Sequence, residues 1–243
     1  MELKISVVVP AFNEEKLIAA TLARIQSAAA AFTRAGWTSE LIVCDNNSTD
    51  RTAEIARAAG ATVVFEPVNQ IGRARNTGAA AATGDWLLFV DADSHPSPEL
   101  LADVVTAIQS RRYLAGGSTV RLDDSYFVAG LVVRFWNGIS RSAKLMAGSF
   151  IFCETAAFRE LGGFNLQLYA SEEIELSQRF KRLARQRRQR LVILHRHPLV
   201  TSARKMHLYG HREHLRFIAR TLLARGGTLN NAKDCNIWYD GRR

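Results

Sequence analysis

A chain of 243 residues with 47% apolar residues is large enough for one sizeable domain, or a domain with an appendage, and lacks the composition of a disordered protein. Its longest apolar stretches, such as 127–133, are far too short to cross a membrane, and its first residues lack the features of a secretory signal peptide. Three scattered cysteines form no metal-binding spacing and cannot all pair, which is typical of a reducing compartment such as the cytoplasm.

The formal net charge of +9 is unevenly distributed along the chain. Residues 171–225 contain 14 Lys and Arg against 4 Asp and Glu, whereas the rest of the chain is close to neutral. A block of positive charge of this kind indicates an anionic partner, which could be a diphosphate, acidic lipid headgroups or nucleic acid.

In the first half of the chain, short apolar runs alternate with helix-forming, Ala-rich segments, which predicts a mostly parallel sheet with helices on both faces. We expect strands at residues 4–10, 40–44, 61–65 and 86–90, and helices at 14–35, 52–59 and 70–82. The alternation weakens after about residue 115, where we expect helices at 127–146, 155–161, 171–189 and 209–225, and strands at 148–153 and 191–195. The simplest division is one domain over residues 1–225 with a loose tail at 226–243.

Polar residues follow the first two predicted strands. Pro10 ends the first strand and precedes Phe12 and Glu14, where an acid can complement the dipole of the next helix. Asp45 begins a polar cluster after the second strand, in which it could form an Asx turn, while Asp50 could cap the next helix. Because ligands of open parallel α/β sheets bind at the carboxyl ends of the strands, these residues are also candidates for ligand contacts.

The fourth predicted strand ends in two carboxylates, Asp91 and Asp93. On extended backbone, residues two apart point the same way, so both carboxylates could converge on one point. Converging carboxylates repel each other unless a cation lies between them, and oxygen ligands favour Mg²⁺ or Mn²⁺, which keep open positions for phosphate oxygens. Diphosphate chemistry is therefore the first hypothesis. The alternative is that both acids are turn residues that cap a helix beginning near Pro98 and Glu99.

Charged residues also lie at the starts of two later helices. Arg73 and Arg75 begin the predicted helix at 70–82, where backbone N–H groups and guanidinium groups both attract anions. Ser171 could cap a charged helix whose first turn contains Glu172 and Glu173. An interaction of about 0.3–1 kcal/mol with the helix dipole would explain these acids without any catalysis.

Together these residues resemble family 2 glycosyltransferases of the GT-A fold. The motifs that carry the resemblance stand in the family's order: VPAFNEE at 9–15, DNNSTD at 45–50, GRARN at 72–76, DAD at 91–93, GGF at 162–164 and SEEIEL at 171–176. Each motif alone is common, but their order along residues 4–210 is specific. The resemblance implies a Rossmann-like GT-A sheet with a nucleotide-sugar-binding half at 1–114 and an acceptor-side half at 115–225.

The resemblance also implies roles for the residues that bind the donor. Pro10, Phe12 and Glu14 would line the nucleobase and ribose pocket, Asp45 would accept a hydrogen bond from uracil, and Arg75 would face the nucleotide.

The remaining candidates would act on the diphosphate. Asp91 and Asp93 would hold the divalent cation, Mn²⁺ or Mg²⁺, with His207 as a candidate third ligand. Arg204 and Lys205 follow a predicted strand and would hold the leaving diphosphate by charge.

The proposed chemistry is transfer of a sugar from a UDP-sugar to a hydroxyl acceptor. In the resembled family the second acid of the pair at the acceptor side is an Asp that serves as general base, and inversion at the anomeric carbon follows from the resemblance. Glu173 stands at that position here and could do the same proton transfer, with Glu172 as the reserve.

The basic third of the chain suggests a location and two competing hypotheses. Together with the aromatic and basic residues of 127–136, it could dock a cytoplasmic enzyme onto the anionic inner face of a membrane. One competing hypothesis is a nucleotidyltransferase, but the expected Gly-rich phosphate loop near the N-terminus is missing, since the first glycine is Gly36. The other is a catalytically silent module that binds membrane or nucleic acid. Nucleic acid is the less favoured partner. The sequence places acids at three separate strand or helix ends, and a module that binds a polyanion has no use for them.

Overall fold

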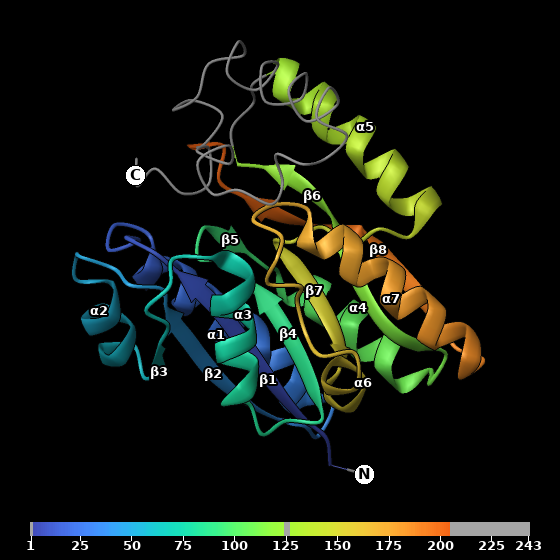
Figure 1. The fold of residues 1–243 in the computed structure, drawn as a ribbon, viewed down its shortest axis with the longest axis horizontal. Coiled ribbons are helices and arrows are strands. Elements are labelled where there is room, and N and C mark those ends of the chain that lie inside the picture. Colours follow the sequence, from blue (N-terminus) through green and yellow to red (C-terminus); the bar gives the residue numbers. More distant parts are fainter. Residues whose placement is uncertain (1, 124–126, 205–243) are drawn as a thin grey trace.

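The computed structural model of the chain describes residues 2–123 and 127–204, which form a single eight-stranded sheet with the order β3-β2-β1-β4-β7-β6-β8-β5 (Figure 1). The strands are β1 Lys4–Ala11, β2 Thr38–Asp45, β3 Thr62–Phe65, β4 Trp86–Val90, β5 Ser94–His95, β6 Tyr113–Leu122, β7 Phe150–Glu154 and β8 Arg190–Thr201. The helices are α1 Ile18–Arg34, α2 Thr52–Ala58, α3 Ile71–Ala80, α4 Pro98–Gln109, α5 Phe127–Ala143, α6 Thr155–Glu160 and α7 Glu172–Gln186. This mostly parallel α/β architecture confirms the predicted fold class.

The first half of the fold is a parallel sheet with the predicted strand–helix alternation. β1 pairs in parallel with both β2 and β4, and β2 pairs in parallel with β3. The largest difference from the predicted bounds is at α1, which begins at Ile18 instead of Glu14. The residues between them form a turn, in which the Glu14 carbonyl accepts hydrogen bonds from the N–H groups of Leu17 and Ile18.

The second half adds antiparallel pairs and curls the sheet. β7 lies antiparallel between β4 and β6, and β8 runs parallel to β6. β5 begins only four residues after the end of β4, yet it pairs with β8 at the far end of the strand order, so the sheet bends back on itself. One sheet thus continues from residues 1–114 into residues 115–204. The division into a nucleotide-sugar-binding half and an acceptor-side half at residues 114 and 115 is a division of function, and it stays a prediction. The predicted helix at 209–225 and the tail at 226–243 lie outside the described residues.

β6 was not predicted, because glycines at its centre obscure the strand pattern. A Cβ on Gly116 would lie 2.6 Å from both the Phe152 ring and the Val192 carbonyl oxygen. The adjacent strands β7 and β8 therefore leave room only for glycine at this position. β8 is also longer than predicted, because it continues past His195 to Thr201.

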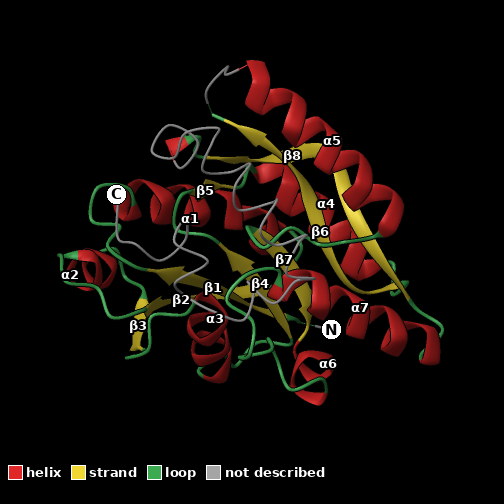
Figure 2. Ribbon diagram, turned by 45° about the horizontal axis from the view of Figure 1, so that its top comes forward, coloured by secondary structure: helices red, strands yellow, loops and turns green. Residues whose placement is uncertain are grey.

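Helices lie on both sides of the central strands (Figure 2). Alternate residues of these strands face two separate hydrophobic cores. On one face, Val7 of β1 and Leu88 of β4 pack with α1 and α4. On the other face, Val8 and Phe89 pack with α3, α6 and α7. Two-sided burial explains why β4 is an unbroken apolar run. Among the described residues, no helix is both long and apolar enough to span a membrane.

Replacing Gly78 by Ala is expected to destabilise the fold, because the new Cβ would lie 2.4 Å from Cγ1 of Val8 in the core. Overpacking of this kind costs about 1–3 kcal/mol in the free energy of unfolding, which denaturant titration can measure. Gly130→Ala in α5 is the matched control, since no atom lies within 4 Å of its added Cβ. The control should be neutral or stabilising, and an equal loss in both variants would contradict the packing argument.

Candidate active site

Asn46, a buried residue that the sequence pattern presents only as part of a turn, joins the end of β1 to the segment between β3 and α3. Its backbone N–H donates to the carbonyl of Ala11 at the end of β1 (2.8 Å). Its side-chain amide donates to the carbonyls of Glu66 (3.2 Å) and Val68 (2.6 Å), and its Oδ1 accepts from the N–H of Gln70 (3.0 Å). Asn46 therefore fixes the start of α3 relative to the ends of β1 and β2. A polar residue directly after a predicted buried strand was the available signal.

The acids of the predicted turn cluster have distinct positions. Asp45 is buried at the end of β2, and its Oδ1 accepts a hydrogen bond from the N–H of Ser48 (3.2 Å). This contact is the turn contact expected as one alternative for Asp45. The other alternative, a hydrogen bond to a nucleobase, stays a prediction. Asp50 accepts from the N–H of Thr52 (2.9 Å), the first residue of α2, although the N-cap position itself is Arg51, which forms no side-chain cap.

Glu14 and Arg204 form an ion pair between residues that are far apart in the sequence. Nη2 of Arg204 donates to both carboxylate oxygens of Glu14, at 2.7 and 2.8 Å. Glu14 is only 5% exposed, and its backbone N–H donates to Oγ1 of Thr52 (2.7 Å). The structure thus brings together a residue predicted for the ribose side and one predicted for the diphosphate side. The half-buried Phe12 lies two residues before Glu14, and Pro10 is buried within β1.

After β4 the chain turns immediately, which corrects the expected extended backbone at Asp91 and Asp93. The N–H of Ser94 donates to the carbonyl of Asp91 (3.0 Å), closing the turn. Asp91 is half-buried, whereas Asp93 is 6% exposed and has the Ser94 hydroxyl at 3.5 Å from its Oδ1. The alternative reading is confirmed for the turn and for the helix start at Pro98, but its capping role is wrong. The N-cap of α4 is Ser97, whose Oγ accepts from the N–H of Leu100 (3.1 Å).

Arg75 lies at the centre of the site and is 2% exposed. Its Nη1 donates to Glu172 (2.7 Å), and its Nη2 donates to Asp91 (2.9 Å) and to the carbonyl of Gly148 (2.9 Å). Its guanidinium carbon lies 5.2 Å from the centre of the Phe164 ring. Burial by itself lowers the pKa of Arg75, but the charges of Asp91 and Glu172 outweigh it and raise that pKa. In this arrangement Arg75 is a buried counter-ion for two carboxylates, and its nucleotide-facing role stays a prediction.

The first turn of α7 presents Glu172 and Glu173 beside Arg75. Ser171 does not cap this helix with its side chain; it has a left-handed backbone (φ 63°) that redirects the chain into α7. Glu172 is 3% exposed and Glu173 is half-buried. Arg75 thus joins the end of β4 to the start of α7, so that Asp91 and the two acids of α7 lie around one guanidinium.

The two acids of α7 shift each other's pKa. Burial, and then the charge of Glu172, raise the pKa of Glu173 to about 8. Burial also raises the pKa of Glu172, although Arg75 partly opposes the shift. A hydrogen bond between the two side chains lowers the pKa of Glu172 and raises the pKa of Glu173. A carboxyl group with a pKa near neutrality can exchange a proton with an acceptor hydroxyl.

Replacing Arg75 by Met is expected to destabilise the protein by about 3–5 kcal/mol, because it leaves the buried Glu172 and the half-buried Asp91 without their counter-ion. The loss should be smaller at mildly acidic pH, where Glu172, whose pKa is raised by burial, becomes protonated and loses its charge. Urea titrations at two pH values would measure both effects. Arg73→Met is the matched control, because the half-buried Arg73 donates only from Nε to Gln70 among the described residues. Equal losses in both variants would contradict the counter-ion role.

Two predicted site residues, Lys205 and His207, lie outside the described residues. Within the described ranges, no cluster of three Asp, Glu, His or Cys side chains forms a complete metal cage. Asp91 and Asp93 stay the predicted metal ligands; such a pair of carboxylates suits a cation that shares its remaining positions with phosphate oxygens.

Comparison with known proteins gives a family and a fold. The model of the family "Glycosyl transferase family 2" matches residues 6–160. An uncharacterized glycosyltransferase of Mycobacterium tuberculosis is 38% identical over 104 residues, which cover 41% of this chain and 43% of that protein. The dolichol-phosphate mannosyltransferase of Pyrococcus furiosus is 26% identical over 187 residues, 72% of this chain and 49% of that protein. The match therefore spans less than half the length of these curated relatives.

Two solved structures share the fold. One is a mannosyltransferase from Pyrobaculum calidifontis in complex with GDP-Man and Mn²⁺, with a TM-score of 0.70 and 22% identity over 97% of this chain and 65% of that one. The other is glucosyl-3-phosphoglycerate synthase from Mycobacterium tuberculosis in complex with Mn²⁺, UDP and phosphoglyceric acid. It has a TM-score of 0.60 and 25% identity, covering 93% of this chain and 79% of that one.

Proposed function

The chain belongs to glycosyl transferase family 2, and on that premise we propose that it transfers a sugar from a UDP-sugar to a hydroxyl acceptor. The observation that carries the proposal is the cluster in which Arg75 joins Asp91 to Glu172. It unites a carboxylate at the end of a sheet strand, the usual place for a nucleotide ligand, with a buried acid pair that can move a proton.

The residues at the end of β4 fit a divalent cation. Asp91 and Asp93 are not used to cap α4, and Arg75 occupies only Oδ1 of Asp91 among the described contacts. When bound, Mn²⁺ or Mg²⁺ would neutralise the charge that develops on the diphosphate as it leaves. UDP as the nucleotide and inversion as the outcome are part of the proposal; UDP and Mn²⁺ occur together in the complex of the mycobacterial synthase.

Glu173 is the proposed general base. Its carboxylate takes the proton of the acceptor hydroxyl while that oxygen attacks the anomeric carbon and the bond to the diphosphate breaks. Burial and Glu172 raise the pKa of Glu173 to about 8, which makes it a stronger base than an exposed glutamate but requires it to lose its own proton first. Transfer should therefore accelerate as the pH rises toward 8.

The basic C-terminal third supplies charge for an anionic surface, and we propose that the enzyme works at the cytoplasmic face of a membrane. A Lys or Arg side chain that lies near an anionic surface contributes about 1 kcal/mol to such binding.

Thermal shift with nucleotide diphosphates and their sugars, each with and without Mn²⁺, tests the proposed donor. Among the nucleotides tested, UDP-sugars should raise the melting temperature most when Mn²⁺ is present. Without Mn²⁺ they should raise it only slightly. At a ligand concentration of 100 times Kd, the expected gain is about 2.7 kcal/mol. A larger shift with GDP than with UDP would contradict UDP specificity. Salt-dependent binding to nucleic acid, without a shift by any nucleotide, would favour the silent basic module instead.

A further inference from the structure

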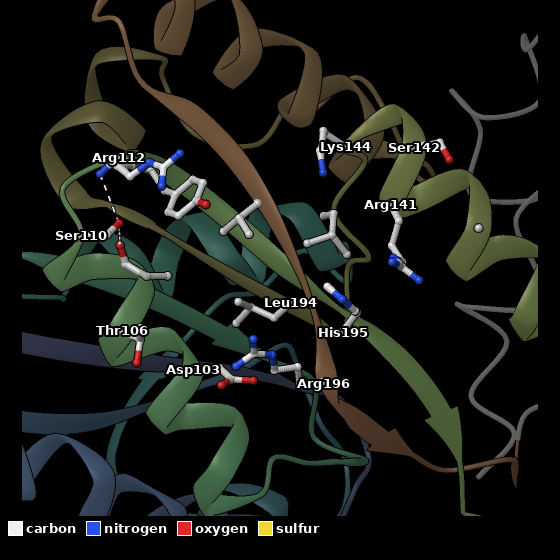
Figure 3. A pocket seen from close by; sticks show the side chains of 15 residues that line it. Asp103, Thr106, Ser110, Arg112, Arg141, Ser142, Lys144, Leu194, His195 and Arg196 are labelled. Atoms are coloured by element: carbon white, nitrogen blue, oxygen red, sulfur yellow. Dashed lines mark hydrogen bonds between the residues drawn. The ribbon is translucent and has the colours of Figure 1, made fainter.

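A pocket rich in positive charge lies between α4, α5 and β8 (Figure 3). These elements do not contribute to the cluster of Arg75, Asp91 and Glu172, which we call the acid–arginine cluster. Its volume is about 790 Å³, which is in the range of small-molecule sites. The cationic side chains that line it are Arg112, Arg141, Lys144 and Arg196, with His195 among them. We refer to this cavity as the cationic pocket.

The charge of the cationic pocket is not balanced by its own residues. Asp103 is the single acid among the lining residues, and its Oδ2 lies 3.0 Å from Nδ1 of His197. Arg141 and Lys144, near the end of α5, point toward the strand that carries His195 (Figure 3). Guanidinium and ammonium groups that face one cavity from different elements favour a phosphate group as ligand.

The helix beside the cationic pocket exposes an apolar stripe. Leu131, Phe135 and Ile139 are four residues apart on α5, and they are 52%, 73% and 38% exposed; Val132 beside them is 57% exposed. Residues at this spacing line one side of a helix. We call these four residues the apolar stripe. An exposed group of large apolar side chains of this kind marks an interaction surface.

The orientation of α5 is fixed by contacts on its other side. The side-chain amide of Asn137 donates to the carbonyl of Val120 in β6 (2.8 Å) and its Oδ1 accepts from the N–H of the same residue (3.0 Å). Ser140 is fully buried and donates to the carbonyl of Leu145 (2.6 Å). These contacts hold the apolar stripe outward, so its exposure is built into the fold.

The apolar stripe and the cationic pocket share one helix. Gly138, Arg141 and Ser142 line the pocket, while Ile139, between them in sequence, belongs to the stripe. A ligand that combines a phosphate with hydrocarbon would satisfy both features at once. A soluble phosphate would leave the stripe exposed to water, and nucleic acid offers it no hydrocarbon.

We propose that α5 docks the enzyme onto an anionic membrane, with a lipid phosphate headgroup in the cationic pocket and the apolar stripe in the acyl boundary. An amphipathic helix that carries basic residues beside its apolar face binds membranes in this way. The proposal rests on the proposed membrane association, but it assigns the contact to α5 and the pocket instead of to the basic face of α7.

Cosedimentation with vesicles of phosphatidylcholine, with and without phosphatidylglycerol, tests this assignment. The wild-type protein should bind the anionic vesicles, and the double variant Arg141→Glu/Lys144→Glu should bind them at least about tenfold more weakly. Phe135→Ser should also weaken binding, because it removes the most exposed member of the apolar stripe. All three substituted residues are exposed, so the variants should keep the melting temperature of the wild type.

The matched control is Arg182→Glu/Arg185→Glu on α7, which makes the same change of charge on another exposed surface. It should retain vesicle binding within about threefold at physiological salt, where distant charges are screened. Loss of binding in this control, with binding retained by Arg141→Glu/Lys144→Glu, would overturn the assignment. A second result would also overturn it: the wild-type protein does not bind anionic vesicles, but inorganic phosphate or pyrophosphate raises its melting temperature. In that case the same phosphate would not raise the melting temperature of Arg141→Glu/Lys144→Glu, and the pocket would be a site for soluble phosphate.

UDP-sugar hydrolysis in solution separates this proposal from the proposed function. The Arg141→Glu/Lys144→Glu variant should hydrolyse the donor at the wild-type rate, because the pocket lies outside the acid–arginine cluster. Vesicle binding by a protein that neither binds nor hydrolyses any nucleotide-sugar would refute the enzyme while leaving the docking surface intact. Hydrolysis without vesicle binding would refute the docking surface alone.

Discussion

Replacing Asp93 by Ala is expected to abolish sugar transfer and UDP-sugar hydrolysis while the fold stays intact. The carboxylate is 6% exposed and is not required by α4, which Ser97 caps. The backbone carbonyl of Asp93, which accepts from the N–H of Ser202 (3.0 Å), is unchanged in the variant. Removing one group that stabilises a developing charge typically costs about 10²–10³-fold in rate, and removing a metal ligand should cost at least as much. The release of UDP would measure the loss.

The control for this variant is Asp85→Ala at the opposite end of the same strand. Asp85 is exposed, and its Oδ2 accepts from the N–H of Lys4 (2.8 Å), far from the proposed diphosphate. This variant should keep its activity. Excess chelator should reproduce the Asp93→Ala phenotype in the wild type, so full activity in chelator or in Asp93→Ala would exclude the metal mechanism.

Replacing Glu173 by Gln should reduce transfer by about 10²–10⁴-fold while binding of the UDP-sugar is retained, because the amide cannot accept the acceptor's proton. The same change should stabilise the protein at high pH. Burial and Glu172 raise the pKa of Glu173 from 4.5 to about 8. Between these values the folded state holds a proton that the unfolded chain releases, so the contribution of Glu173 to stability falls as the pH rises.

Melting temperatures of wild type and Glu173→Gln, measured from pH 4.5 to above pH 8, would show the effect directly. As the pH increases, the variant should melt at an increasingly higher temperature than the wild type. The difference should be about 2–4 °C for each kcal/mol of difference in the free energy of unfolding. Glu172→Gln is the control for the assignment of the base. If that variant loses transfer while Glu173→Gln keeps it, Glu172 is the base. A Glu173→Gln variant that is both active and no more stable would contradict the proposed acid pair.

The parallel half of the fold could be predicted because its strands and helices have distinct periodic patterns. β4 and the acids after it were found from one apolar run, Trp86–Val90, that ends in Asp91 and Asp93. β6 was missed because Gly116 and Gly117 interrupt its pattern, and their reason lies in the neighbouring strands. Sequence spacing also carried no sign that β7 would be antiparallel, since pairing direction depends on how distant segments meet.

In the site, too, local features could be predicted from the sequence and long-range contacts could not. The position of the acids at strand and helix ends was visible in the sequence, because turn and cap chemistry is local. The partners of Arg75 were not, since Glu172 lies 97 residues away in the chain. The pair of Glu14 and Arg204 spans 190 residues, and only the curled sheet brings the end of β8 to the loop after β1. Long-range ion pairs of this kind depend on the finished fold.

The location of the metal and the nucleotide in a crystal of the UDP complex grown with Mn²⁺ tests the central claim most directly. Anomalous scattering should place Mn²⁺ within about 2.0–2.2 Å of a carboxylate oxygen of Asp93, with diphosphate oxygens completing its shell. The diphosphate should then lie between that cation and the side of the site where Glu173 lies in the first turn of α7. A nucleotide bound elsewhere, or one bound at this edge of the sheet with no metal at Asp93, would contradict the account.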